Sequence, residues 1–119
     1  MNAYFYSENF AFSSEEQMAT DEWMLLQTDM CSAFGFRVYR MVETCTIGRN
    51  QKFDLIKERT EAYKTLVRRP TGGGTVFHDA DLIYTLTIPS QHALYDLKLG
   101  DLYYKVHTLV NRVFKYFSV

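Results

Sequence analysis

The sequence has little of what marks several large protein classes. Its two cysteines, Cys31 and Cys45, are too few for a disulfide framework and have no metal-binding spacing, which predicts a reducing, cytoplasmic location. No apolar run approaches the roughly 18 residues of a membrane span, and no basic segment with an apolar core marks a signal peptide. The net charge of −1 argues against bulk nucleic-acid binding. We therefore expect no membrane and no nucleic acid among its partners.

What is present is typical of one folded domain. Hydrophobic residues make up 47% and aromatic residues 16% of the 119 positions, which excludes a disordered chain. The charges are unevenly placed, because residues 1–36 contain six acidic residues and no lysine or arginine. Residues 37–69 contain nine basic and four acidic residues, which favours a small anionic ligand over a polyanion. A solvated basic face is the alternative.

Hydrophobic periodicity predicts a mixture of helices and strands. A capping box, Ser13 with Glu16 or Ser14 with Gln17, precedes a helical apolar stripe over 14–30 that consists of Ala19, Trp23, Leu26 and Met30. Strands are predicted over 36–41, 44–47, 66–69 and 82–88, a short helix over 53–64, and a helix over 101–117. This order predicts an α/β (α+β) fold in which a mixed sheet is packed with helices.

The most informative local feature is a run of three glycines. Gly72, Gly73 and Gly74 follow a predicted strand and the pair Arg68-Arg69. Three adjacent glycines cost backbone entropy, so the fold is expected to need a close approach or a positive φ there. Backbone N–H groups in such a turn, beside two guanidinium groups, can bind an anion. A hairpin turn flanked by surface arginines is the alternative, and the spacing matches neither a Walker A loop nor a dinucleotide fingerprint.

Histidine and cysteine give weaker signals. His78 and Asp79 could form a proton-transfer pair, although adjacent residues of a strand point to opposite faces. His92 and His107 have no partner pattern. Cys45 lies within a predicted strand, where a buried and inert thiol is expected.

Residues 68–79 carry a resemblance to a known family. Their sequence, Arg-Arg-Pro-Thr-Gly-Gly-Gly-Thr-Val-Phe-His-Asp, resembles the signature of lipoate-protein ligases and of the related cysteine-dependent octanoyltransferases. Residues 18–22 (Met-Ala-Thr-Asp-Glu) and 47–51 (Ile-Gly-Arg-Asn-Gln) resemble two further family segments in the same order. The resemblance extends over residues 18–89 and implies the α/β core that this family shares with biotin ligases.

The resemblance implies an activity and a site. Ligases of this family use ATP, with Mg²⁺, to adenylate lipoate or octanoate, and they transfer the acyl group to a lysine of a lipoyl carrier domain. The carriers are domains of 2-oxoacid dehydrogenases or the glycine cleavage H protein. By resemblance, Tyr39, Gly48 and Arg49 belong to the acyl pocket, and no residue is assigned to a metal. The ATP or acyl-adenylate site would comprise Arg69, Gly72, Gly73, Gly74, Thr75, Val76, Phe77 and His78.

Two departures from the family pattern affect the prediction. Residues 80–84 (Ala-Asp-Leu-Ile-Tyr) are closer to the octanoyltransferase branch, whereas Gly74 is closer to the ligases. The family's catalytic lysine or cysteine lies beyond the last predicted helix, and no lysine here occupies the matching place. We therefore expect residues 1–119 to be the N-terminal portion of a single catalytic domain, with an incomplete core and no activity alone, completed by a second chain or by self-association.

Other functions remain open from the sequence. An octanoyl-carrier-protein-dependent octanoyltransferase is one alternative, and a non-catalytic remnant that binds an acyl group or a nucleotide is another. Biotin ligation is disfavoured because the glycine-rich segment of biotin ligases has the sequence Gly-Arg-Gly in place of the three adjacent glycines found here.

Overall fold

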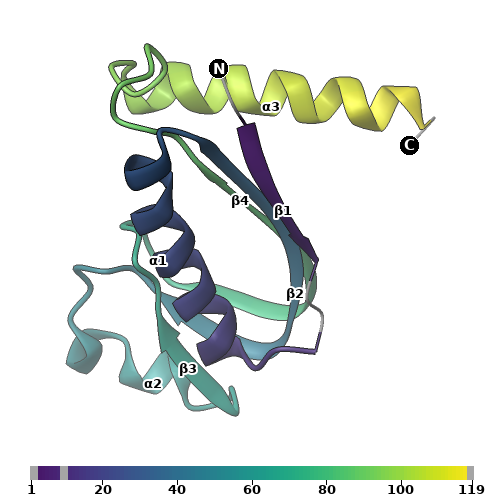
Figure 1. The fold of residues 1–119 in the computed structure, drawn as a ribbon. Helices are drawn as coiled ribbons and strands as arrows, with labels where there is room; N and C mark the ends of the chain where they lie inside the picture. The colour runs from purple at the N-terminus through teal and green to yellow at the C-terminus, as the bar shows by residue number, and fades with distance from the viewer. Residues whose placement is uncertain (1–2, 9–10, 118–119) are drawn as a thin grey trace.

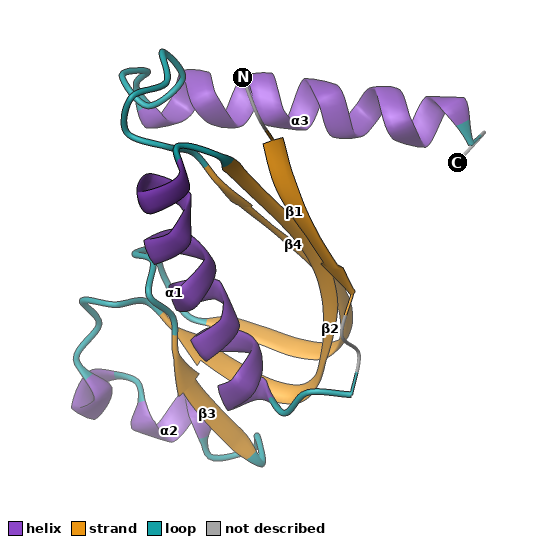
Figure 2. Ribbon diagram, viewed as in Figure 1, coloured by secondary structure: helices purple, strands orange, loops and turns teal. Residues whose placement is uncertain are grey.

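The computed structural model describes residues 3–8 and 11–117 and has a mixed sheet packed with helices (Figures 1 and 2). This architecture confirms the α/β prediction. In chain order the elements are β1 (Ala3–Glu8), α1 (Ser14–Cys31), β2 (Phe34–Ile47), the 3-10 turn η1 (Phe53–Leu55), α2 (Lys57–Thr60), β3 (Thr65–Arg68), β4 (Val76–Thr87) and α3 (Leu99–Tyr116).

The long strand β2 organises the sheet. β4 pairs with it antiparallel from Gly35–Thr87 to Thr46–Val76. β1 and β3 pair with it in parallel, β1 along its first residues and β3 along its last four. The prediction of two separate strands, 36–41 and 44–47, is wrong, because the backbone continues as one strand through Glu43. Glu43 has a positive φ of 47°, but pairing with β4 continues on both sides of it, at Val42–Ala80 and Thr44–His78.

Helix α1 covers one face of the sheet and contacts β2, β3 and β4 (Figure 2). It begins as predicted, with the Ser13 side chain accepting from the Glu16 N–H and the Glu16 carboxylate accepting from the Ser13 N–H. The predicted apolar stripe is wrong, since Trp23, Leu26 and Met30 are 49%, 62% and 78% exposed. The buried face instead consists of Gln17, Met18, Asp21, Met24 and Thr28.

A buried polar network explains this choice of face. The Arg37 guanidinium, which is fully buried, donates to the Asp21 carboxylate at 2.8 Å and to the Gln17 carbonyl at 2.9 Å. Tyr39 and Thr85 also donate to Asp21, each at 2.9 Å. Burial of a charged group is tolerated when it is paired and hydrogen-bonded. A mixed polar and apolar side of α1 therefore faces the sheet, and Met18 on that side packs in a small apolar cluster with Tyr39 and Met41.

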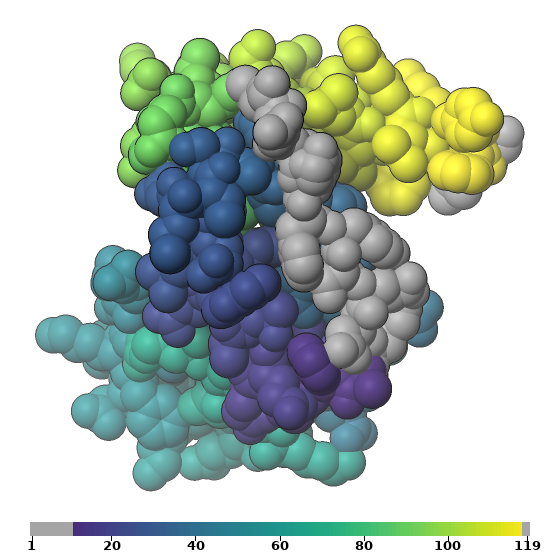
Figure 3. All heavy atoms as spheres, viewed as in Figure 1, coloured from purple at the N-terminus to yellow at the C-terminus, as the bar shows by residue number. Residues whose placement is uncertain are grey.

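Other helices are less enclosed. The predicted helix over 53–64 is instead a 3-10 turn followed by the one-turn helix α2, in which only Thr60 is buried. Helix α3 lies across one end of the sheet and extends beyond it (Figures 1 and 3). None of its residues is buried, and its exposed side chains include Tyr104, Leu109, Val113 and Phe114.

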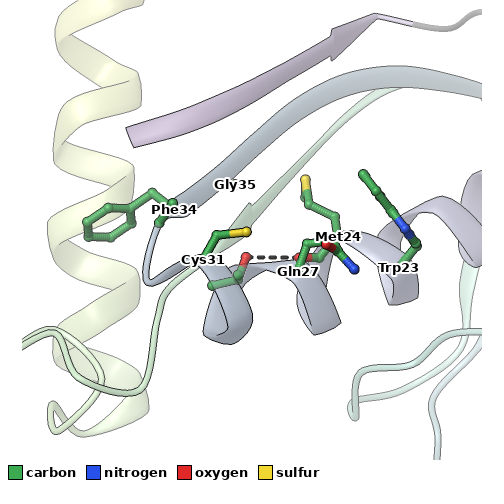
Figure 4. Close-up of a pocket in the computed structure, with 8 residues that line it drawn as sticks. Trp23, Met24, Gln27, Cys31, Phe34 and Gly35 are labelled. Atoms are coloured by element: carbon green, nitrogen blue, oxygen red, sulfur yellow. Dashed lines mark hydrogen bonds between the residues drawn. The ribbon is translucent and has the colours of Figure 1, made fainter. Parts of the chain in front are cut away.

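Gly35 sets the distance between α1 and the sheet. A Cβ at this position would lie 2.4 Å from Thr87 Oγ1 and 2.7 Å from Met24 Cγ. Figure 4 shows Gly35 and Met24 at the wall of a cavity of about 200 Å³ that Trp23 and Cys31 also line. The absence of a side chain at Gly35 therefore permits the close contact of helix and strand.

Replacing Gly35 with alanine is expected to lower the free energy of unfolding by about 1–3 kcal/mol, because the new methyl group overpacks this contact. Equilibrium urea denaturation measures the change. Gly100→Ala is the matched control, because a Cβ there meets no atom within 4 Å and Gly100 lies in helix α3. Equal stability of the two variants would contradict the packing argument.

Candidate functional site

Two segments that are distant in the sequence meet where β2 and β3 end. The Gly48 turn (residues 48–51) follows β2, and the glycine loop (residues 69–75) joins β3 to β4. Parallel neighbouring strands end at the same edge of a sheet, which brings the two segments together. The Arg49 N–H donates to the Thr71 carbonyl at 2.8 Å, and Gln51 Nε2 donates to Thr75 Oγ1 at 3.1 Å. The two motifs thus form one surface.

Glycine is required at two positions of this surface. A Cβ on Gly48 would lie 2.0 Å from the Gly73 carbonyl oxygen, so the Gly48 turn and the glycine loop approach too closely for a side chain. Gly73 has a φ of +94°, a conformation that favours glycine. Gly72 and Gly74 have open space where a Cβ would be. The expectation of a close approach or a positive φ is therefore confirmed for Gly73 and extends to Gly48.

We expect Gly48→Ala to displace the glycine loop, because the backbone oxygen of Gly73 cannot move aside as a flexible side chain would. The free energy of unfolding should fall by about 1–3 kcal/mol, as measured by urea denaturation. Gly72→Ala, in the same surface with no atom within 4 Å of the added Cβ, should change it by less than about 0.5 kcal/mol. A smaller effect for Gly48→Ala than for Gly72→Ala would contradict the close approach.

The two arginines of the motif bind loop carbonyls. Arg69 Nη1 donates to the carbonyl and hydroxyl of Thr46 at 3.2 and 2.9 Å, and Arg69 Nη2 donates to the carbonyls of Gly72 and Gly74 at 3.0 and 2.7 Å. Partial burial lowers the pKa of Arg69. Arg68 donates to the carbonyls of Gly48, Arg49 and Gln51. Each arginine thus orders one of the two segments.

The backbone of the glycine loop keeps unused donors. Among the described residues, no hydrogen-bond acceptor contacts the N–H groups of Gly72, Gly73 and Gly74, and all three residues are exposed. Their carbonyls, by contrast, are partly occupied by Arg69. Free N–H groups next to a cation can bind an anion.

His78 is buried beside this loop and pairs with a carboxylate other than its sequence neighbour. Its Nδ1 lies 2.9 Å from Asp81 Oδ2, and its Nε2 lies 3.0 Å from Thr46 Oγ1. Asp79 instead accepts a long hydrogen bond from the Tyr63 hydroxyl at 3.4 Å. A His78–Asp79 pair is therefore not formed, because adjacent strand residues point to opposite faces.

The remaining predicted site residues lie at different depths. Val76 is exposed at the start of β4, and Phe77 is partly buried and stacks on Tyr63 with ring centroids 5.0 Å apart. Tyr39 is buried, and its hydroxyl donates to Asp21. Burial, followed by the nearby Asp21 carboxylate, raises the pKa of Tyr39 above its usual range. The structure thus gathers Gly48, Arg49 and residues 69–75 at one surface and places the Tyr39 hydroxyl in the buried network.

A cavity of about 620 Å³ opens beside this surface, between α1 and the end of β3. Apolar side chains from α1 and β3 line it, including Met18, Leu25, Leu26 and Val67, and the cations Arg49, Arg68 and Arg69 line it as well. Glu15 and Glu22 add two acidic groups from α1. Reasoning from the sequence did not assign these α1 residues to the site, although the match at residues 18–22 pointed to that helix.

Cys45 is expected to resist modification in the folded protein, because it is fully buried and burial raises the pKa of its thiol. Cys31 is exposed. A thiol-specific reagent at neutral pH should therefore modify one cysteine per native chain and two after denaturation, as counted by mass spectrometry. Rapid native modification of Cys45 would contradict the buried strand pairing.

No group of three or more histidine, cysteine, aspartate or glutamate side chains in residues 11–117 is arranged to hold a metal ion. No helix among the described segments combines the length and apolarity that crossing a bilayer requires.

A family model and a curated protein that are similar to this chain both belong to the lipoate ligases. Residues 13–119 match the model of the lipoyl protein ligase A/B catalytic domain. Lipoate-protein ligase A of Bdellovibrio bacteriovorus is 42% identical over 66 residues, which cover 52% of this chain and 19% of that protein.

Solved structures of a lipoate protein ligase-like protein from T. acidophilum are also similar. The structure with bound lipoic acid has a TM-score of 0.54 and 26% identity, over 72% of this chain and 37% of that chain. A second structure of the same protein has a TM-score of 0.51 and 25% identity, over 72% of this chain and 38% of that chain. The chain thus spans less than two fifths of the solved relative and about a fifth of the Bdellovibrio protein. Because the family match covers almost the whole sequence, the chain belongs to the lipoyl protein ligase A/B catalytic-domain family.

Proposed function

We propose that this chain forms the nucleotide-binding and acyl-binding part of an ATP-dependent lipoate or octanoate ligase. In that reaction a carboxylate oxygen of the fatty acid attacks the α-phosphorus of ATP, and pyrophosphate leaves. A carrier-domain lysine amine then attacks the acyl carbon, and AMP leaves. Family membership supports the proposal, as does the lipoic acid bound to the T. acidophilum relative.

The observation that carries the proposal is the combination of free backbone donors and cations on the glycine loop. A carboxylate and a phosphate repel each other, so bringing them together requires positive charge or hydrogen-bond donors that are already in place. The N–H groups of Gly72, Gly73 and Gly74 are available for this role, and Arg69 and Arg49 add positive charge beside them. Thr75, Val76 and Phe77 continue the backbone along the proposed nucleotide, and His78 lies behind it.

The adjacent cavity suits the acyl chain. Met18, Leu25, Leu26 and Val67 offer apolar contacts, and the arginines at the cavity offer a partner for the carboxylate. We propose Gly48 and Arg49 as part of the pocket wall, with Tyr39 behind it in the core. Mg²⁺ would arrive with ATP and neutralise phosphate oxygens, since no cluster of metal-binding side chains is present among the described residues.

The transfer residue is proposed to come from another segment or another chain. No lysine or cysteine lines the 620 Å³ cavity. Phe36, Val42, Leu82 and Tyr84 are exposed on β2 and β4, and the alternation along these strands places them on the face opposite Arg37, Tyr39 and Met41. We propose that this uncovered apolar face packs against the remainder of the catalytic domain, and that the acceptors are lipoyl carrier domains.

ATP–pyrophosphate exchange and ligand-induced thermal stabilisation test the proposal. ATP with Mg²⁺ and octanoate should raise the unfolding temperature of the chain, and replacing octanoate with biotin should remove the acid-dependent part of the increase. Acyl transfer to a lipoyl domain by the isolated chain should be undetectable. No stabilisation by ATP, together with octanoyl transfer from octanoyl-acyl-carrier protein in a reconstituted complete domain, would replace the ligase with the octanoyltransferase. Stabilisation without exchange, even in a reconstituted complete domain, would favour a binding remnant.

A further inference from the structure

A continuous set of hydrogen bonds connects Asp81, in the middle of β4, to the glycine loop. Asp81 contacts His78 Nδ1 at 2.9 Å, and His78 Nε2 contacts Thr46 Oγ1 at 3.0 Å. Thr46 Oγ1 in turn accepts from Arg69 Nη1 at 2.9 Å, and Arg69 Nη2 donates to the carbonyls of Gly72 and Gly74. Thr46 is 1% exposed and His78 is 7% exposed, so water does not compete freely for these groups.

With a neutral imidazole at His78, the donors and acceptors allow one direction along this chain of hydrogen bonds. A carboxylate only accepts, so His78 must carry a proton on Nδ1 to bond Asp81. The other nitrogen of the neutral imidazole is then an acceptor, and the Thr46 hydroxyl must donate to it. Thr46 Oγ1 keeps its lone pairs for Arg69, which only donates. Every contact is satisfied in the order Arg69 to Thr46 to His78 to Asp81.

This arrangement changes the role expected of Arg69. Its two terminal nitrogens carry four hydrogens, and the four contacts at Thr46, Gly72 and Gly74 account for all of them. Arg69 therefore acts mainly through the loop, by holding two of its carbonyls and leaving the neighbouring N–H groups available. Thr46 supplies two of the four acceptors that orient the guanidinium.

We propose that Thr46, His78 and Asp81 are positioning residues that orient Arg69 and, through it, the anion-binding conformation of the glycine loop. The inference rests on the proposed function, in that the loop is taken to bind the phosphates of ATP. A valine at position 46 would keep the shape of the side chain and lose the hydroxyl, whereas a serine would retain the hydroxyl. The contact with the Thr46 carbonyl is unaffected by either change.

The experiment measures the order of the glycine loop and the tautomer of the His78 imidazole, both independently of ATP binding. In ¹⁵N-labelled full-length chain, the imidazole nitrogen shifts of His78 report its tautomer, and the amide resonances of Gly72, Gly73 and Gly74 report the order of the loop. The neutral His78 should carry its proton on Nδ1. Thr46→Val should broaden or shift the three glycine amides and weaken ATP binding about tenfold, the effect of losing one hydrogen bond to a charged group. Thr46→Ser should restore both to within about threefold of the parent chain.

Asp81 and Asp79 provide a matched pair of surface changes. Asp81→Ala should alter the His78 tautomer equilibrium and the glycine amides, whereas Asp79→Ala, two residues away, should leave both unchanged. If Thr46→Val does not fold, the Asp81→Ala and Asp79→Ala comparison decides the matter. A His78 proton on Nε2, or glycine amides unchanged in both Thr46→Val and Asp81→Ala, overturns the proposal. Absence of ATP binding by the parent chain would refute the proposed function, while the tautomer and amide measurements would still test the positioning chain.

Discussion

Replacement of Arg69 with alanine is expected to weaken the proposed ATP binding by about a hundredfold and to slow the proposed adenylation accordingly. The substitution removes a positive charge and the donors to the Gly72 and Gly74 carbonyls, so the glycine loop loses both its cation and its order. Two charge-assisted hydrogen bonds of about 1.5 kcal/mol each account for a factor of this size. Isothermal titration with ATP measures the affinity, and pyrophosphate exchange in a reconstituted complete domain measures the rate.

Two control variants separate the effect of the positive charge from the effect of the several donors that the planar guanidinium group provides. Arg69→Lys keeps the charge but cannot reach Thr46, Gly72 and Gly74 with one ammonium group, so it should recover only a small part of the affinity. Arg112→Ala removes an exposed cation from helix α3 that does not line the 620 Å³ cavity, and it should leave the proposed ATP binding unchanged. Unchanged ATP affinity and exchange rate in Arg69→Ala would remove Arg69 from the site.

Replacement of Asp21 with asparagine is expected to lower the free energy of unfolding by about 3–5 kcal/mol, because it leaves the fully buried Arg37 without its counter-charge. The Asp21 carboxylate accepts from Arg37, Tyr39 and Thr85, and an amide would turn its NH₂ group toward one of these donors. This loss is a large fraction of the total stability of a small domain. Urea denaturation followed by circular dichroism measures it.

Two variants check the cause of this loss. Glu22→Gln changes the neighbouring exposed carboxylate on the same helix and should alter stability by less than about 0.5 kcal/mol. The double variant Asp21→Leu with Arg37→Met removes both charges and should be more stable than Asp21→Asn, because no buried charge is left unpaired. A double variant less stable than Asp21→Asn would contradict this explanation, because the loss of stability could not then come from an unpaired buried charge.

Most elements could be predicted because their signals are local. The capping box at Ser13 and Glu16 predicted the start of α1 to within a residue, and alternation predicted the second half of β4. The apolar face of α1 was predicted wrongly, since periodicity assumes that buried means apolar. That assumption fails here because Arg37, on strand β2, forms a buried ion pair with Asp21 of the helix, 16 residues earlier in the sequence. A partner on another element is invisible to a pattern within one helix.

The family and the fold class could be predicted from the sequence alone, because a motif of twelve adjacent residues needs no tertiary contact to be recognised. Which groups act together was decided only by the tertiary structure. Parallel pairing of β2 with β3 brings Gly48 against Gly73 across 25 positions of sequence, and antiparallel pairing of β2 with β4 brings Thr46 to His78. The physical reason is that hydrogen-bond partners are selected by strand register, and register depends on the whole sheet.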